Sequence, residues 1–226
     1  MASFHLTLGS DLLALSEYDH RMQTLRHRKK VYNRQNMLDT AKRLFIENGY
    51  SKTTMEDIAE QAGFGVATLY NYFKTKEGMF AAMGHDDMSE LKTLGEAALE
   101  DLPDDPVEGV LALLKIYLKV FDYISYAVMQ EFIIQSKTKG PLHDVEEWAI
   151  TWQRDQVKVV LDTAKTSGRL DSGLDTSLMS YVVTDLFIQH TQRISNNRNN
   201  KHQFSKLRKI INLVLGGWQL QKTKPL

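Results

Sequence analysis

Residues 53–76 read TTMEDIAEQAGFGVATLYNYFKTK, and they carry the strongest structural signal in the sequence. Its first half places apolar side chains at i, i+3, i+4 and i+7, the spacing of a helix with one apolar face. These side chains are Met55, Ile58, Ala59 and Ala62. Thr53 lies three residues before Glu56, and this pair predicts a capping box that starts the helix.

A tight turn separates this helix from a second one. Gly63 can take the positive φ that such a turn needs, because glycine has no Cβ. The helical spacing of apolar residues then resumes at once, with Val66, Leu69, Tyr70 and Phe73. Two short amphipathic helices joined through a glycine turn predict a helix-turn-helix, whose second helix has the size of the DNA major groove.

The residues of the second helix carry a family resemblance. Residues 65–77, GVATLYNYFKTKE, resemble the recognition-helix signature of TetR-type transcriptional repressors, and Thr53-Thr54 before Ile58-Ala59 fits the same pattern. The specific likeness covers about residues 30–80, and beyond them it is one of helical layout. The resemblance implies an all-α fold with a three-helix DNA-binding head and a helical body that binds a ligand and dimerises.

Composition agrees with an all-α chain. The 226 residues include four prolines and thirteen glycines, and no run of alternating apolar residues stands out. The absence of cysteine excludes disulfides, cysteine-ligated zinc and thiol catalysis, and it fits a cytoplasmic protein. No apolar stretch approaches the roughly 20 residues that span a bilayer, and no secretory signal is expected at the first residues.

The net charge of zero hides an asymmetry along the chain. Between Arg21 and Phe80 there are eleven Lys and Arg against six Asp and Glu, and the remainder carries the opposite surplus. A basic segment that contains a helix-turn-helix, attached to an acidic body, is the charge layout of a DNA-binding head on a second domain.

The first 34 residues allow two interpretations. Residues 1–20 form either a short helix with Leu12, Leu13 and Leu15 or an extension, and residues 21–34 are basic. The basic segment is either an arm that neutralises phosphates or enters a minor groove, or a solvated lead-in to the first helix. Its basic residues are Arg21, Arg26, Arg28, Lys29, Lys30 and Arg34.

The apolar spacing predicts about nine helices in three regions. The regions are an extension (1–30), a helix-turn-helix domain (31–78) and an effector-binding and dimerisation domain (79–226). The first clear helix has Met37, Leu38, Ala41, Leu44 and Phe45 on one face and ends at Asn48-Gly49. Thr75 is expected to cap the helix that links head to body, where Gly84 predicts a kink or close packing. Later helices are expected at about 107–124, around Met129, Phe132 and Ile133, and at about 142–166, 175–195 and 203–219.

The last two helices are expected to dimerise. The resemblance implies that paired helices from two subunits form a four-helix bundle, and a two-fold axis would multiply the specificity of a short recognition helix. The alternative is that both helices close the core of a monomer. We favour the dimer.

The resemblance also assigns residues that contact DNA. It places Thr68, Tyr72 and Lys76 at backbone contacts, Tyr70 at a backbone or base-edge contact, and Gly65, Val66 and Ala67 at base edges. Thr54 lies in the first turn of the leading helix, where a hydroxyl suits a phosphate. The side chains of residues 65–67 form no hydrogen bonds, so readout would depend on thymine methyl groups and close backbone approach. Core packing is the alternative for Val66 and Tyr70.

An effector pocket is implied by the resemblance in the body. The residues that would line it are aromatic or flexible: Met83, Met88, Tyr117, Phe121, Met129, Phe132, Trp148 and Trp152. The effector is expected to be small and hydrophobic or aromatic, and ordinary core packing is the alternative for each residue. Asp122 and Glu131 lie in the most apolar region, where an acid would pair with a polar or cationic group or face water.

An enzyme is the rival class. The dipeptides His85-Asp86 and His143-Asp144 invite comparison with metal-dependent phosphohydrolases, but such sites need a further His and a distant Asp. No HExxH, phosphate loop or Ser/His/Asp spacing occurs. We therefore expect no catalytic residue, cofactor or metal. The expected partners are duplex DNA, a second copy of the chain and a small molecule, with no membrane; a DNA-binding dimer without an effector is the remaining alternative.

Overall fold

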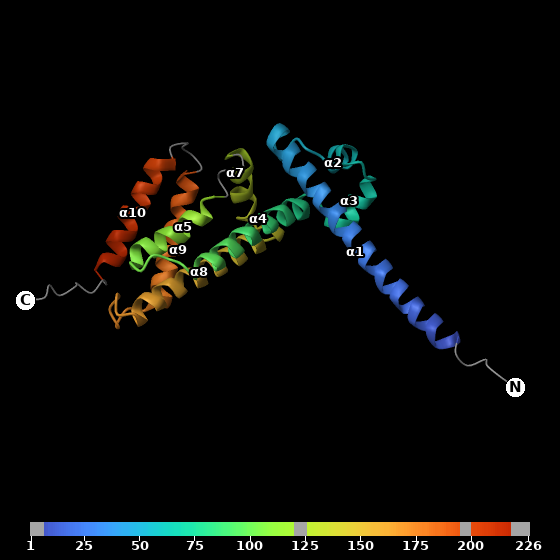
Figure 1. Cartoon of the computed structure of the whole chain (residues 1–226). Coiled ribbons are helices and arrows are strands. Elements are labelled where there is room, and N and C mark those ends of the chain that lie inside the picture. The colour runs from blue at the N-terminus through green and yellow to red at the C-terminus, as the bar shows by residue number, and fades with distance from the viewer. Residues whose placement is uncertain (1–6, 120–125, 195–199, 218–226) are drawn as a thin grey trace, which may run out of the picture.

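The computed structural model describes residues 7–119, 126–194 and 200–217 (Figure 1). Within these ranges the chain forms nine α-helices and no strand, which confirms the predicted fold class. The helices are α1 (Thr7–Asn48), α2 (Met55–Ala62), α3 (Val66–Phe73), α4 (Lys76–Ala98), α5 (Pro106–Tyr117), α7 (Tyr126–Gln135), α8 (Pro141–Thr166), α9 (Thr176–Ile194) and α10 (Asn200–Gly216). Among the described residues, no helix has both the length and the apolarity that crossing a bilayer requires.

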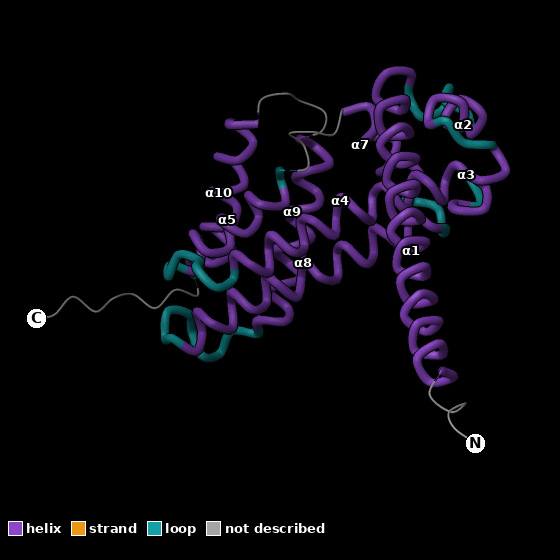
Figure 2. The backbone as a smooth tube through the Cα atoms, turned by 45° about the vertical axis from the view of Figure 1, so that its right-hand side comes forward, coloured by secondary structure: helices purple, strands orange, loops and turns teal. Residues whose placement is uncertain are grey.

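Helix α1 is much longer than the sequence indicated. It runs without a break through the basic segment, and its N-terminal part extends away from the rest of the molecule (Figures 1 and 2). The basic segment is helical, as the lead-in interpretation expects, and an α-helix about 10 Å wide exceeds the width of an undeformed minor groove, about 6 Å. Contact of this segment with DNA stays a prediction. The side chains of residues 26–32 are exposed.

The head is built around the second half of α1. The five apolar residues that the sequence placed on one face of this helix are all buried, and the helix ends at Asn48 before Gly49, whose φ is 85°. They pack on Ile58 of α2, Leu69 of α3 and Phe80 of α4. The rings of Phe45, Tyr50 and Phe80 lie 4.7–5.5 Å apart between centroids.

The core of the head continues past residue 78. Met79, Phe80 and Met83 on α4 belong to it, together with Leu142 on α8 and Val128 on α7. The start of α4 is therefore part of the head, while its second half, with Leu91, packs in the core of the body. Helices α4 and α8 thus each contribute to both cores.

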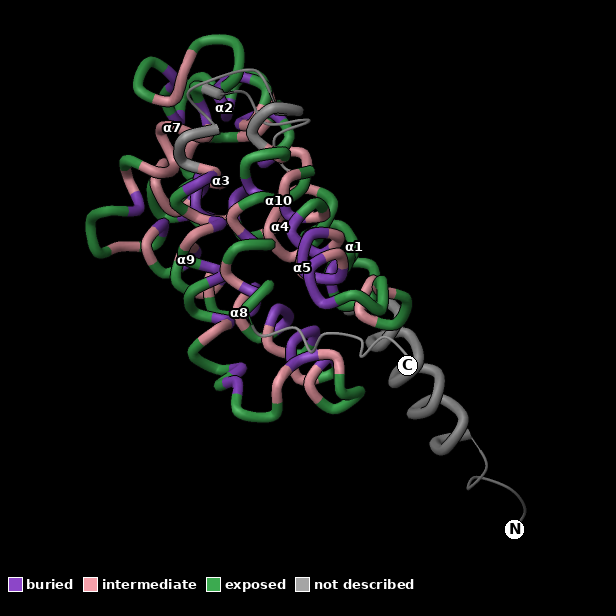
Figure 3. Tube along the Cα trace, turned by 90° about the vertical axis from the view of Figure 1, so that its left-hand side faces the viewer, coloured by how far each residue is buried: buried purple, intermediate pink, exposed green. Residues whose placement is uncertain are grey.

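The body surrounds α5 and the pair formed by α4 and α8, which run side by side (Figures 1 and 2). Helix α5 is mostly buried, as its all-round apolar sequence predicts (Figure 3). It begins with Pro106 after the cap Asp105 and ends at Tyr117 rather than Ile124. Helices α9 and α10 complete the body by packing on α8 and α5.

Candidate nucleic-acid interface and ligand cavity

Helix α2 starts one residue later than predicted. Thr54, not Thr53, is its N-cap, and its partner in the capping box is Asp57 rather than Glu56. The Asp57 N–H donates to Thr54 Oγ1 at 3.1 Å, and the Thr54 N–H donates to Asp57 Oδ2 at 2.8 Å. Thr53 is buried instead, and its hydroxyl donates to the carbonyl oxygens of Leu44 and Gly49. Thr53 with Glu56 and Thr54 with Asp57 both have the i, i+3 spacing of a capping box. Because the side chain of Thr53 is buried, Thr54 is the residue that caps the helix.

We predict that Thr54→Ala lowers the free energy of unfolding by about 1 kcal/mol, because it removes the cap. The hydrogen bonds from Thr54 also lower the pKa of Asp57 from its usual value of 3.8. A lowered pKa stabilises the fold above the unfolded pKa, and that stabilisation is lost as pH falls through the folded pKa. In Thr54→Ala, NMR titration should show the Asp57 pKa returning towards 3.8, whereas in a Glu56→Ala control, which removes a neighbouring negative charge, it should not rise. An unchanged Asp57 pKa in Thr54→Ala would contradict the assigned cap.

The turn and helix α3 form as the sequence predicts. Gly63 caps α2 with a φ of 73°, a left-handed conformation that suits glycine. In α3, Leu69 and Phe73 are buried in the core of the head, which fixes how the helix is rotated. Its opposite side is open: Gly65, Ala67, Tyr70 and Asn71 are exposed, and Val66, Thr68 and Tyr72 are partly exposed. Tyr70 therefore does not pack inside the head.

Two predicted DNA contacts have partners inside the chain. The Tyr72 hydroxyl donates to the carbonyl oxygen of Lys30 at 3.5 Å, which connects α3 to the basic part of α1. The Lys76 ammonium donates to the carbonyl oxygens of Tyr50 and Thr53, each at 3.0 Å, and lies 4.4 Å from the centroid of the Tyr50 ring. The first residue of α4 thus holds the loop between α1 and α2, a role that the sequence did not indicate.

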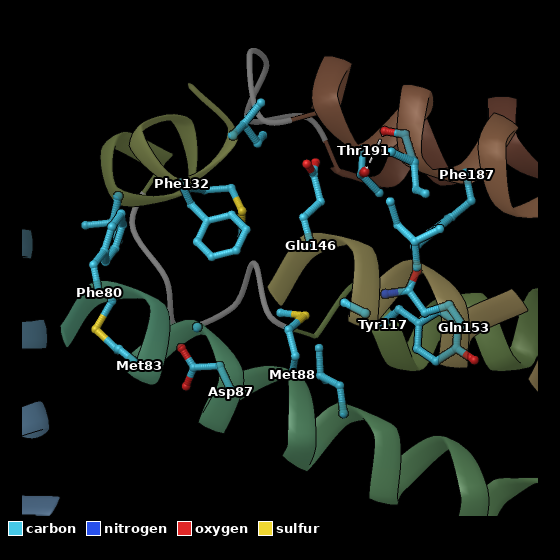
Figure 4. Close-up of a pocket in the computed structure, with 18 residues that line it drawn as sticks. Phe80, Met83, Asp87, Met88, Tyr117, Phe132, Glu146, Gln153, Phe187 and Thr191 are labelled. Atoms are coloured by element: carbon cyan, nitrogen blue, oxygen red, sulfur yellow. Dashed lines mark hydrogen bonds between the residues drawn. The ribbon is translucent and has the colours of Figure 1, made fainter. Parts of the chain in front are cut away.

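A cavity of about 140 Å³ lies in the body, between five helices. Side chains from α4, α5, α7, α8 and α9 surround it, and in Figure 4 Phe132 and Glu146 stand opposite Asp87 and Met88. Its lining residues are Phe80, Met83, Gly84, Asp87, Met88, Leu91, Tyr117, Val128, Met129, Phe132, Ile133, Glu146, Ala149, Ile150, Gln153, Phe187, Ile188 and Thr191. The cavity is mostly apolar with a few polar groups, which is the usual character of small-molecule sites.

Five of the eight predicted pocket residues line this cavity. They are Met83, Met88, Tyr117, Met129 and Phe132. Trp148 and Trp152 do not line it: Trp148 stacks on His85 with 4.4 Å between ring centroids, and Trp152 is buried edge-on against Tyr117. Phe121 lies outside the described residues, as does Asp122. Glu131 accepts a hydrogen bond from Gln135 and is not among the lining residues.

The acids of the cavity were not recognised from the sequence. Asp87 accepts hydrogen bonds from Lys42 of α1 at 2.8 and 3.1 Å, and Glu146 forms an ion pair with Lys137 at 3.3 Å. Burial raises the pKa of Asp87, and Lys42 opposes that shift. A signal for Asp87 did exist: Met83, Asp87 and Leu91 follow one another at i, i+4 and i+8, so an acid interrupts an apolar stripe of α4.

Gly84 allows α7 to approach α4 beside the cavity. A Cβ at this position would lie 2.6 Å from the Phe132 ring, too close for any side chain to fit without movement. The expectation of close packing at Gly84 is confirmed. The Phe132 ring also contacts Phe80, with 6.0 Å between centroids, so the cavity wall continues into the core of the head.

The two His-Asp dipeptides lie apart from the cavity. The His143 ring approaches the Ser136 carbonyl oxygen at 3.1 Å, and Asp86 accepts hydrogen bonds from Arg34. In the described part of the chain, no group of three or more His, Cys, Asp or Glu side chains is arranged to hold a metal ion.

Known proteins resemble this chain in sequence and in fold. Residues 37–83 match the family model for bacterial regulatory proteins of the tetR family. The transcriptional repressor ComR of Escherichia coli is 43% identical over 58 residues, which are 26% of this chain and 28% of ComR. The transcriptional repressor KstR2 of Mycolicibacterium smegmatis is 28% identical over 156 residues, which are 67% of this chain and 74% of KstR2.

A solved structure shares the fold. The crystal structure of the transcriptional regulator FadR from Bacillus subtilis, in complex with stearoyl-CoA, superposes with a TM-score of 0.63 over 81% of this chain and 98% of that chain. Their sequences are 18% identical, so this likeness concerns the fold alone. ComR, KstR2 and FadR are named as transcription regulators and not as enzymes, in agreement with the prediction that this chain is not an enzyme. The family match over residues 37–83, together with these relatives, supports a TetR-family transcriptional regulator.

Proposed function

We propose that the protein is a repressor that binds a palindromic DNA operator as a homodimer and leaves it when a small apolar or aromatic molecule enters the cavity. In this proposal residues 31–78 bind DNA, and residues 79–226 bind the effector and dimerise. The observation that carries it is the orientation of α3. Leu69 and Phe73 anchor the helix in the head, and its other side lies open to a duplex.

The exposed side of α3 would recognise bases mainly through apolar contacts, because the side chains at the start of the helix have no hydrogen-bonding groups. Gly65, Val66 and Ala67 at its start offer close backbone approach and methyl contacts to thymine. Thr54, Thr68 and Tyr72 would contact the phosphates and position the helix, and Tyr70 would contact backbone or base edges. For Lys76 we propose a second role, because its ammonium already orders the loop that precedes α2.

The homodimer is supported by an apolar face on α9. Leu178, Tyr181 and Val182 are exposed at i, i+3 and i+4, while Val183 and Phe187 on the other side are buried. Exposed apolar side chains at this spacing favour association with a second protein surface, and a two-fold copy would bring two recognition helices onto one duplex.

The cavity sets the size of the effector. An engineered apolar cavity of about 150 Å³ accepts benzene, so this cavity suits a molecule about as large as one substituted ring. FadR is seen with stearoyl-CoA, a far larger and anionic ligand. For this chain we propose an effector that is smaller, because the cavity measures about 140 Å³, and that is not anionic, because the charged side chains among the described lining residues are the acids Asp87 and Glu146.

Helix α4 would transmit effector binding from the cavity to the DNA-binding helices. Its second half lines the cavity through Asp87, Met88 and Leu91, and its first residue, Lys76, holds the loop before α2. A ligand that favours a different tilt of α4 would therefore displace α3. To change occupancy from mostly bound to mostly free, its preference for the released form must reach several kcal/mol.

We predict that Tyr70→Ala weakens operator binding about tenfold, because it removes the most exposed large side chain of α3, whereas it leaves the fold intact. Duplexes selected from a genomic pool at low salt should share a palindrome, and fluorescence anisotropy would then compare the variant with the parent protein. Parent affinity should fall steeply with salt. Leu94→Ala, on α4 away from this surface, is the control. If no duplex is bound at low ionic strength, the proposed function is wrong.

A further inference from the structure

Two neighbouring aspartates on α4 both bind α1, but only one of them lines the cavity. Asp86 accepts hydrogen bonds from Arg34 at 2.6 and 3.2 Å, and Asp87 accepts them from Lys42 at 2.8 and 3.1 Å. The Asp87 side chain is 12% exposed and forms part of the cavity wall (Figure 4), whereas Asp86 is 36% exposed and does not. Asp87 is therefore shared between the cavity and the first helix of the head.

The charged side chains that a ligand would meet in the cavity are acidic. Among the described residues that line it, the acidic side chains are Asp87 and Glu146, and none is a lysine, arginine or histidine. Gln153 and Thr191 add neutral polar groups, and phenyl rings and thioethers make up much of the rest. An anionic ligand would meet two carboxylates, while an ammonium would meet carboxylates and aromatic faces, both of which attract cations.

In the structure, Lys42 neutralises the carboxylate of Asp87 with its ammonium group. It reaches the carboxylate from α1, and its own side chain is 26% exposed, so water can accept it if it leaves. Asp87 cannot be rehydrated so easily, and burial already raises its pKa. A carboxylate as buried as that of Asp87 is stable only when a cation neutralises it. That cation can be Lys42 of α1, or it can be a charged group of a ligand in the cavity.

We propose that the cavity selects small aromatic amines, whose ammonium group binds Asp87 in competition with Lys42. This inference rests on the proposed function, and it names both the class of effector and the contact that it breaks. Among the described side chains, two ion pairs join α1 to α4; exchange at Asp87 removes one of them, and the Arg34–Asp86 pair stays in place. The charge of the ligand thereby determines whether the Lys42–Asp87 ion pair between the head and the body is kept or broken.

The test is a series of three ligands with one ring and different charge: benzylamine, benzyl alcohol and benzoate. Isothermal titration at pH 7.5 with the full-length protein should show benzylamine binding at least tenfold more tightly than benzyl alcohol, and benzoate binding most weakly. Equal binding of the amine and the alcohol overturns this inference but leaves the proposed repressor intact. If none of the three binds, both the inference and the proposed effector cavity are wrong, while operator binding is measured independently.

Three variants assign the preference to Asp87. Asp87→Asn should bind benzylamine and benzyl alcohol equally, whereas Asp86→Asn, which also breaks an ion pair between α4 and α1, should keep the preference of the parent protein. Lys42→Gln should bind benzylamine several times more tightly and benzyl alcohol unchanged, because the competing ammonium is gone. A purely structural ion pair predicts no such gain, so an unchanged amine affinity in Lys42→Gln overturns the exchange even if Asp87→Asn does not fold.

Discussion

Replacing Leu178 with glutamate should dissociate the proposed homodimer and lower operator affinity by about 100-fold, or roughly 2.7 kcal/mol. Leu178 is 62% exposed in the single chain and belongs to the apolar face of α9 with Tyr181 and Val182. In the dimer it would be buried, and a carboxylate buried without a partner costs several kcal/mol. Each separated subunit would hold one recognition helix, so the gain from two half-sites would be lost.

Sedimentation velocity and anisotropy measure the two parts of this prediction separately. The matched control is Ile134→Glu, because Ile134 on α7 is equally exposed but lies outside the α9 face. It should leave both the oligomeric state and the affinity unchanged. A Leu178→Glu protein that stays dimeric, or that binds the operator like the parent, would show that subunits associate through another surface.

Phe80→Ala should lower the free energy of unfolding by about 3–5 kcal/mol, the range found for large aromatic side chains removed from cores. Phe80 is fully buried and contacts Phe45 and Tyr50 of the head, and it also contacts Phe132 beside the cavity. Its removal leaves a void where α4 passes from one core to the other. For a chain of this size the melting temperature should fall by about 6–20 °C.

Differential scanning calorimetry checks this value, with Leu94→Ala as the control on the same helix. Leu94 is 39% exposed, so its truncation should cost less than about 1 kcal/mol. Phe80 belongs to the core of the head and also lines the cavity of the body. In the variant, the head and the body should therefore unfold less cooperatively, over a broader range of temperature. A loss below 1 kcal/mol in Phe80→Ala would mean that the two cores are not joined through this ring.

The features that the sequence predicted correctly are local ones. The apolar spacing in residues 53–76, the turn at Gly63 and the cap at Thr75 each depend on residues within one or two helical turns. The same holds for the end of α1 at Asn48. Such patterns are set by backbone geometry and by one apolar face, which a sequence displays directly.

The wrong predictions concern positions whose outcome depends on contacts with other helices. Thr53 with Glu56 and Thr54 with Asp57 both fit a capping box, and the choice depended on carbonyl oxygens of α1 that accept the Thr53 hydroxyl. Trp148 and Trp152 lie four residues apart, as a pocket wall would require, yet the rotation of α8 turns them towards His85 and Tyr117. Packing against other helices settles these questions, and a sequence does not display it.

The spacing of apolar residues was enough to predict a helical chain that carries a helix-turn-helix. Which side chains surround the cavity, and which acid connects it to the head, follows from the packing of distant helices. In the sequence, only the interrupted apolar stripe of Met83 and Leu91 distinguishes Asp87 from Asp86, and neighbouring helical residues point about 100° apart. That rotation sends Asp87 to the cavity and to Lys42, 45 residues away, and leaves Asp86 outside with Arg34.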